Sequence, residues 1–241
     1  MRIISFLLFC FFITSANSSV IIMGTRVIYP EKQKSINVQL KNNEDNPSLI
    51  QSWIDIGDAE SAPDAVKVPF IINPPVFRME PKSGQTLRIM YTRENLPNNK
   101  ESLFYLNVLD IPAKPDIYNN ELTKGNNYLQ FAIRSRIKFF FRPDNLMPSP
   151  SEAYERVTWS LEQQPSDTSI KVNNPTPYFI TYNNISTTSN GKVVSIESPG
   201  MVAPYSYSRF TFKQSTPNAK KIYWTVINDY GGYQKGESIL K

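Results

Sequence analysis

The chain is almost without cysteine and entirely without histidine. Of its 241 residues one is Cys, at position 10, and none is His. A disulfide scaffold and a cysteine-based zinc site are therefore excluded. The same absences exclude a Ser-His-Asp triad, a Cys-His pair and a histidine-ligated metal, because each needs an imidazole or a thiolate.

Carboxylates are the catalytic groups that remain. Pairs of Asp and Glu suffice for glycoside hydrolysis, but the 21 acidic residues are scattered along the chain. A phosphate-binding G-x-x-x-x-G-K-[ST] motif is missing as well. We therefore expect a protein that is not an enzyme and that uses no metal and no cofactor.

Long hydrophobic runs are also scarce, and the clearest one stands at the start. Arg2 precedes an apolar run over 3–13, and small polar residues follow. This order is typical of a secretory signal peptide, and the run is shorter than the ~20 residues of a transmembrane helix. We predict a signal peptide over 1–18, cleaved after Ser18, with cleavage after Ala16 as the alternative. The mature chain is then exported and soluble.

The charge balance is only mildly positive. The full chain carries +5, and the leader contributes one Arg and no acid, so the mature chain carries +4. Such an excess is typical of a soluble surface. The basic residues are not grouped with a nucleic-acid-binding module, so we expect no nucleic acid as partner.

The residues that are abundant indicate an all-β protein. The chain has 19 Pro, 13 Tyr and 14 Phe, and its apolar residues form short alternating runs. Candidate strands in the first half occupy 20–29, 35–40, 49–56, 86–92 and 102–111, separated by turn-forming residues. Their number and spacing fit an immunoglobulin-like sandwich.

A proline-rich segment over 142–153, RPDNLMPSPSEA, separates this half from a second set of strands. We find no amphipathic helix of convincing length anywhere in the sequence. We predict two immunoglobulin-like β-sandwich domains: an N-terminal domain at 19–143, a linker at 144–153 and a C-terminal domain at 154–241. The candidate strands of the second domain are 157–162, 169–174, 178–184, 191–197, 208–213 and 222–229.

The longest candidate strand, NYLQFAIRSRIKFFFRP at 127–143, carries two different faces. Apolar residues recur at alternate positions, and mostly polar or basic residues fill the places between. On periodicity alone, such a row belongs in the protein's own core. We call this set the apolar row: Leu129, Phe131, Ile133, Ile137, Phe139 and Phe141.

Five segments carry a further signal: GTRVIYP (24–30), IINPPVFRMEPKSGQTLRI (71–89), ESLFYLNVLDIPAKP (101–115), LQFAIRSRIKFFFRP (129–143) and VINDYGG (226–232). Together they resemble the PapD-like periplasmic pilus chaperones of the chaperone–usher pathway of Gram-negative bacteria. The resemblance runs from about residue 20 to the C-terminus. It implies a periplasmic protein whose two domains form an angled, boomerang-like shape with a cleft between them.

The resemblance also implies an activity. The chain would bind pilin subunits, complete their fold with its own strand, prevent premature polymerisation and deliver them to an outer-membrane usher. In β-augmentation of this kind, main-chain hydrogen bonds give affinity and alternate side chains enter pockets. Leu129, Phe131 and Ile133 would then point into the subunit, while Ile137 and Phe139 to Phe141 stay in the chain's own core.

Five charged residues match family positions that have assigned roles. Arg26 and Lys138 match the basic pair that binds the subunit's C-terminal carboxylate, a role that suits both side chains. Glu101, Arg142 and Asp229 match a salt-bridge network that joins the two domains. Without the resemblance, these three are ordinary surface charges, whose pairs contribute about 0–1 kcal/mol each.

Parity on the strand raises a question about this site. On a regular strand Lys138 lies on the face opposite Leu129, Phe131 and Ile133, so the carboxylate and the subunit groove are reached from different sides unless the strand twists or bulges. Arg134, Arg136 and Lys138 would also act as gatekeepers against edge pairing of the exposed row. A self-capping homodimer is a further expectation.

Two local features follow from the same resemblance. Asn73–Pro74 matches a turn with a cis proline. The segment between Ile111 and Tyr128 lacks the cysteine pair of the long-loop branch, which places the chain nearer the short-loop chaperones.

The alternative is an exported two-domain adhesin or carbohydrate-binding protein, in which exposed tyrosines stack on sugars. The long strand with one apolar and one basic face, together with Arg26 near the N-terminus of the fold, argues against it, because an adhesin needs neither. The candidate tyrosines are Tyr178, Tyr205, Tyr207 and Tyr223.

Overall fold

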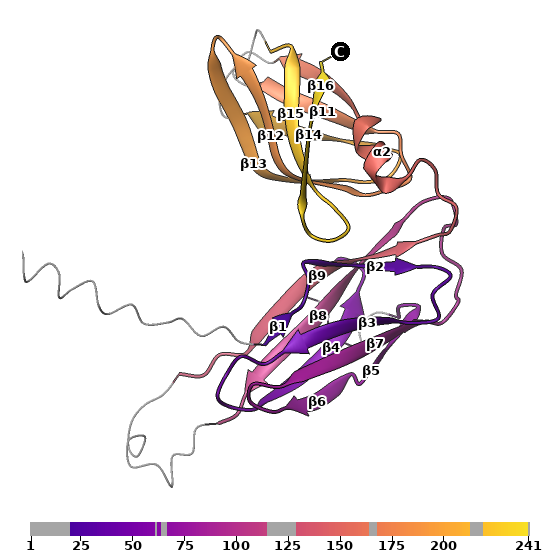
Figure 1. Cartoon of the computed structure of the whole chain (residues 1–241), viewed down its shortest axis with the longest axis vertical. Helices are drawn as coiled ribbons and strands as arrows, with labels where there is room; N and C mark the ends of the chain where they lie inside the picture. Colours follow the sequence, from indigo (N-terminus) through magenta and orange to yellow (C-terminus); the bar gives the residue numbers. More distant parts are fainter. Residues whose placement is uncertain are drawn as a thin grey trace, which may run out of the picture.

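The computed structural model describes residues 20–60, 62–63, 67–114, 129–163, 168–212 and 219–240. The predicted signal peptide over 1–18 and most of the segment between Ile111 and Tyr128 lie outside these residues. Figure 1 shows two β-sandwiches, one above the other, with the turn between the last two strands reaching toward the N-terminal domain. The predicted pair of immunoglobulin-like sandwiches is confirmed. Within the described ranges, no helix has the length and hydropathy needed to cross a membrane.

Two sheets form the N-terminal sandwich, in the orders β1-β3-β7-β5 and β2-β9-β8-β4-β6. Alternation along each strand turns one face inward, and residues such as Leu87, Ile89 and Phe139 are fully buried between the sheets. The strands are β1 (Ile21–Ile22), β2 (Arg26–Pro30), β3 (Ile36–Lys41), β4 (Ser48–Asp55), β5 (Phe70–Asn73), β6 (Val76–Met79), β7 (Gly84–Tyr91), β8 (Ser102–Pro112) and β9 (Ile133–Arg142).

The predicted strand over 20–29 is wrong as a single element. The chain pairs with β3 in one sheet as β1, bends at Met23–Thr25, and enters the other sheet as β2, parallel to β9. Gly24 lies in this bend with φ 142°, a backbone conformation that a side chain disfavours. As a result, β2 pairs with β9 only from Arg26 onward.

Two short strands, β5 and β6, were not predicted, because each has only four residues and lies next to the two prolines at 74–75. The cis peptide bond predicted at Asn73–Pro74 is present, and a second one lies at Met147–Pro148.

The C-terminal sandwich has the sheets β10-β11-β14 and β13-β12-β15-β16, and its core surrounds Trp159, Ile180 and Phe212. β16 was missed, since its alternating residues are all exposed or half-buried. The strands are β10 (Thr158–Gln163), β11 (Thr168–Asn174), β12 (Ile180–Ser189), β13 (Lys192–Val202), β14 (Ser206–Phe212), β15 (Lys221–Ile227) and β16 (Tyr233–Ile239).

A short helix lies in the segment before this domain and overlaps the end of the predicted linker. Pro150–Glu155 forms the short helix α2, with Pro at its first turn, where the missing N–H costs nothing. The Glu152 carboxylate accepts a hydrogen bond from the Ser149 backbone N–H at 2.9 Å. Tyr154 packs into the C-terminal core, so the helix attaches the predicted linker to that domain.

Candidate functional site

Arg26 and Lys138 lie side by side across the parallel pair of β2 and β9, where they are register partners. Both side chains are half-buried and reach toward the C-terminal domain. Arg26 Nη1 donates to the Ile227 carbonyl at 2.9 Å, and Lys138 Nζ lies 3.3 Å from Thr181 Oγ1. The two predicted cations therefore meet in the space between the domains.

The charged forms of Lys138 and Arg26 are both destabilised in this position, so an anion bound here would be favourable. Burial, together with the neighbouring charge of Arg26, lowers the pKa of Lys138 to about 8. Burial also lowers the pKa of Arg26, and its Nε is buried without a hydrogen-bond partner. A carboxylate placed here would satisfy the unpaired N–H and stabilise both charges.

The apolar row changes its surroundings along β9. Phe139 and Phe141 are 0% and 1% exposed in the N-terminal core, whereas Leu129, Phe131 and Ile133 are 79%, 66% and 48% exposed. The C-terminal residues of the apolar row therefore lie in the core, and its N-terminal residues are exposed to solvent. Leu129 and Phe131 precede the strand, which starts at Ile133 and not at residue 127 as predicted.

Phe140 is also buried, but not in the core to which we assigned it. It has the parity of Lys138 and packs against Phe179 of the C-terminal domain, with ring centroids 5.8 Å apart. The assignment was wrong because adjacent strand residues point to opposite faces. Ile137, in contrast, packs against the N-terminal core as expected.

Among the residues that the structure describes, one edge of β9 has no neighbouring strand over part of its length. β8 pairs with β9 from Ile133 to Phe141, but β2 pairs only from Lys138 to Arg142. We call Ile133–Ile137 the open edge. It ends at Arg26 and Lys138, so this edge and the cation pair adjoin each other.

The question of parity is decided by the regular pairing of β8 and β9. Their register runs without a shift from Asp110↔Ile133 to Ser102↔Phe141, so no bulge intervenes. Lys138 therefore points to the interdomain side, and Ile133 to the opposite side of the sheet. The open edge thus has Ile133 on one face of the sheet and ends at Lys138, which lies on the other face.

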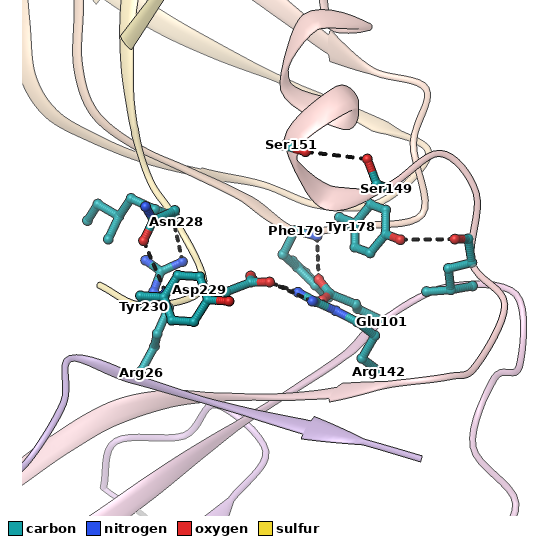
Figure 2. Close-up of polar contacts among 12 residues, drawn as sticks. Arg26, Glu101, Arg142, Ser149, Ser151, Tyr178, Phe179, Asn228, Asp229 and Tyr230 are labelled. Carbon is teal, nitrogen blue, oxygen red and sulfur yellow. Dashed lines mark hydrogen bonds and ion pairs between the residues drawn. The ribbon is translucent and has the colours of Figure 1, made fainter. Parts of the chain in front are cut away.

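The structure also brings Glu101, Arg142 and Asp229 together between the domains (Figure 2). Arg142 Nε donates to Glu101 at 2.8 Å, and its two terminal nitrogens donate to Asp229 at 2.6 and 2.8 Å. The second oxygen of Glu101 accepts from the Phe179 N–H at 2.8 Å. Burial alone would lower the pKa of Arg142, but Asp229 and Glu101 together raise it.

Sequence reasoning missed the C-terminal residues that complete the site. Thr181 and the Ile227 carbonyl meet the two cations, and Gly231 approaches Thr25 so closely that a Cβ would lie 2.5 Å from its Oγ1. The glycine-rich turn after β15 is visible in the sequence, but the spacing of its residues does not predict that it contacts the N-terminal domain. In the part of the chain that the structure describes, no cluster of three potential metal ligands occurs.

Comparison with known proteins covers both domains. Residues 19–147 match the family model "Pili and flagellar-assembly chaperone, PapD N-terminal domain", and residues 152–238 match "Pili assembly chaperone PapD, C-terminal domain". The chain is 43% identical over 228 residues to the chaperone protein HifB of Haemophilus influenzae, covering 94% of this chain and 90% of that protein. It is 40% identical over 232 residues to the probable fimbrial chaperone YadV of Escherichia coli (strain K12), covering 95% and 93%.

Solved structures agree with these matches. The crystal structure of the Pseudomonas aeruginosa CupB2 chaperone superimposes with a TM-score of 0.77 at 34% identity, covering 92% of this chain and 100% of that one. The Salmonella enterica SafB chaperone, solved in complex with the SafA pilin, has a TM-score of 0.73 at 26% identity and covers 94% and 99%.

Proposed function

Because the chain belongs to the PapD-like family of pilus-assembly chaperones, we propose that it lends the open edge of β9 to pilin subunits in the periplasm and passes them to an outer-membrane usher. The observation that carries this proposal is the adjacency of three features. The exposed residues Leu129, Phe131 and Ile133, the open edge and Lys138 follow one another along the chain, and Arg26 lies beside Lys138 on β2. No catalytic group is needed, since the activity is binding.

The arrangement gives the bound strand a direction. β2 begins at Arg26 and runs parallel to β9, so a strand added to the open edge lies in line with β2. Its C-terminal carboxylate reaches Arg26 and Lys138 only if it too runs toward Lys138. We therefore infer parallel addition, with the carboxylate setting the register, because a slip of one residue would turn every side chain to the wrong face.

Leu129, Phe131 and Ile133 then cover the subunit's exposed core as a temporary strand. Release would follow when another pilin's extension replaces β9, without ATP. The same edge would also let a second copy of the chain cover the row in the absence of pilin, which is the basis for a self-capping homodimer.

Truncation of the exposed row tests the proposal. Phe131→Ala is expected to lower pilin affinity by roughly 1.5–3 kcal/mol, because the ring leaves water only in the complex. This corresponds to a loss of about ten- to a hundredfold, measured by titrating purified chaperone with a pilin subunit from the same bacterium. Val193→Ala is the control, since Val193 is 73% exposed, against 66% for Phe131, but lies on β13. Equal affinity of the Phe131 and Val193 variants would contradict strand donation.

Binding is expected to weaken as the pH rises above about 8. The pKa of Lys138 in the free protein is about 8, and a bound carboxylate raises it, so binding requires uptake of a proton at alkaline pH. Affinity should then fall up to about tenfold per pH unit. Calorimetric titrations of the chaperone with the same pilin subunit between pH 7 and 10, at constant protein concentrations, measure this change in affinity.

Lys138→Arg supplies the control for the pH profile, because a guanidinium stays charged throughout this range. Its profile should be flat where that of the wild type falls. The stability of the free protein responds in the opposite sense, since a lowered lysine pKa means that the unfolded chain binds more protons between pH 8 and 10.5. A wild-type profile as flat as that of Lys138→Arg would contradict the role of Lys138.

A further inference from the structure

The two arginines that alternate with the apolar row are held by other strands on the opposite face of the sheet. Arg134 and Arg136 belong to the open edge, and we predicted a gatekeeper role for both. Asp55 at the end of β4 accepts two hydrogen bonds from Arg136, at 2.9 and 2.6 Å. Asp55 lies two strands away, beyond β8, so the contact spans three strands.

Both carboxylate oxygens of Asp55 already accept hydrogen bonds from within the chain. Its side chain also accepts from Asn107 Nδ2 at 2.7 Å and from the Gly57 N–H at 2.7 Å, and the residue is 1% exposed. Burial would raise the pKa of Asp55, but hydrogen bonds from Arg136, Asn107 and Gly57 hold it below its ordinary value. The carboxylate is therefore charged and fully occupied at neutral pH.

Arg134 joins the same cluster. Its Nε donates to Asn107 Oδ1 at 2.9 Å, and its Nη2 lies 3.6 Å from Asp55. Aromatic rings support both guanidiniums: Arg134 lies 4.7 Å from the ring centroid of Trp53, and Arg136 lies 3.6 Å from that of Tyr105. We call Trp53, Asp55, Tyr105, Asn107, Arg134 and Arg136 the brace.

The position of the brace matters because the open edge has a neighbour on only one side. Strand ends with a single neighbour open locally at low free-energy cost, and two adjacent cations on one face repel each other. Asp55 neutralises that repulsion and ties Arg134 and Arg136 to the interior of the sheet. The brace occupies the face away from the apolar row, so it leaves Ile133 and the edge amides accessible.

We propose that Asp55 is a positioning residue for pilin capture: through Arg136 and Arg134 it holds the open edge in strand conformation before the subunit arrives. The proposal rests on the proposed function of this edge. If the edge is formed in only a fraction of molecules, the apparent dissociation constant rises by the inverse of that fraction, so an edge formed about a tenth of the time costs about tenfold in affinity. The loss falls on the association rate, because binding has to wait for ordering.

The test compares Asp55→Asn with Glu162→Gln. Glu162 is a matched control: it receives two hydrogen bonds from Arg209, at 2.7 and 3.3 Å, and that guanidinium lies 4.9 Å from the Tyr207 ring, on a sheet of the C-terminal domain. Arg136→Lys provides a milder second variant, which keeps the charge but loses the two-pronged contact. The probe is a synthetic peptide with the C-terminal sequence of a pilin subunit from the same bacterium.

Asp55→Asn is expected to slow peptide association about tenfold at an unchanged dissociation rate, and to speed hydrogen exchange in Ile133–Ile137. Arg136→Lys should change both in the same direction, and Glu162→Gln should change neither. Unchanged association in both brace variants, or slower association without faster exchange, would overturn the proposal. If the wild type itself fails to bind the peptide, the proposed function fails and the proposal with it; wild-type binding that the brace variants leave intact overturns the proposal alone.

Discussion

Replacement of Lys138 by alanine is expected to abolish productive pilin capture while the protein stays folded. Truncating one member of a buried, hydrogen-bonded charge pair costs about 2–5 kcal/mol of binding free energy, or a factor of about 30 to several thousand. In the free protein the side chain has one weak hydrogen bond, to Thr181 at 3.3 Å, and its charge is destabilised by burial. The change therefore removes a binding group without removing a structural one.

Co-expression with a pilin subunit measures this effect as the amount of intact periplasmic pilin and its co-purification with the chaperone. Arg26→Ala should behave like Lys138→Ala, because in the proposed complex both cations bind the same carboxylate. Lys171→Ala is the control, since Lys171 lies over the Tyr207 ring of the C-terminal domain. A peptide with an amidated C-terminus should bind the wild type as weakly as the free-acid peptide binds Lys138→Ala. Pilin that survives and co-purifies with either variant would refute the carboxylate role.

The largest expected loss of stability follows from replacing Arg142 by alanine. Glu101 is 3% exposed, and Arg142 supplies its nearest positive charge as well as both hydrogen bonds to Asp229. Breaking a buried pair by removing one partner costs about 3–5 kcal/mol, because an uncompensated charge stays behind. We expect the cost to appear in the cooperativity between the two domains, since Glu101 and Asp229 come from different ones.

Urea denaturation with one probe in each domain measures this prediction. The wild type should unfold both domains in one transition, and Arg142→Ala should separate the two transitions. Small-angle scattering would show a wider distribution of interdomain arrangements in the variant. Arg209→Ala is the matched control, because its exposed pair with Glu162 is worth at most about 1 kcal/mol. An Arg142 variant that loses no more stability than Arg209→Ala would refute a role in joining the domains.

Several features of the fold could be predicted from the sequence because they depend on neighbours along the chain. The alternation in residues 35–40, 86–92 and 102–111 predicts strands close to those observed, since period 2 reports a strand with one buried face. The predicted strand at 20–29 failed because apolar residues continue across the bend at Gly24, and both halves are buried in different sheets.

The candidate site was only partly predictable. Arg26, Lys138, Glu101, Arg142 and Asp229 were selected by resemblance, and the structure places all five between the domains. The brace was not predicted, because Asp55 looks like an ordinary surface charge in the sequence, and Arg134 and Arg136 were selected only as gatekeepers. Their pairing depends on the order of β4, β8 and β9 in the sheet, which no local pattern reports.

The sequence by itself determined the class of protein. Without His and with its one Cys in the predicted leader, the chain lacks the side chains for common catalytic and metal sites, and its alternating runs specify β-sandwiches. Only the tertiary structure decided whether each side chain of β9 lies in the core, against the other domain or in solvent. Phe139 lies in the core and Phe140 against the other domain, while Phe131 of the same row as Phe139 is exposed. The physical reason is that the local pattern sets which residues share a face of a strand, whereas the surroundings of that face depend on residues far away in the sequence. Ile227, which contacts Arg26 in the site, is 201 residues from it.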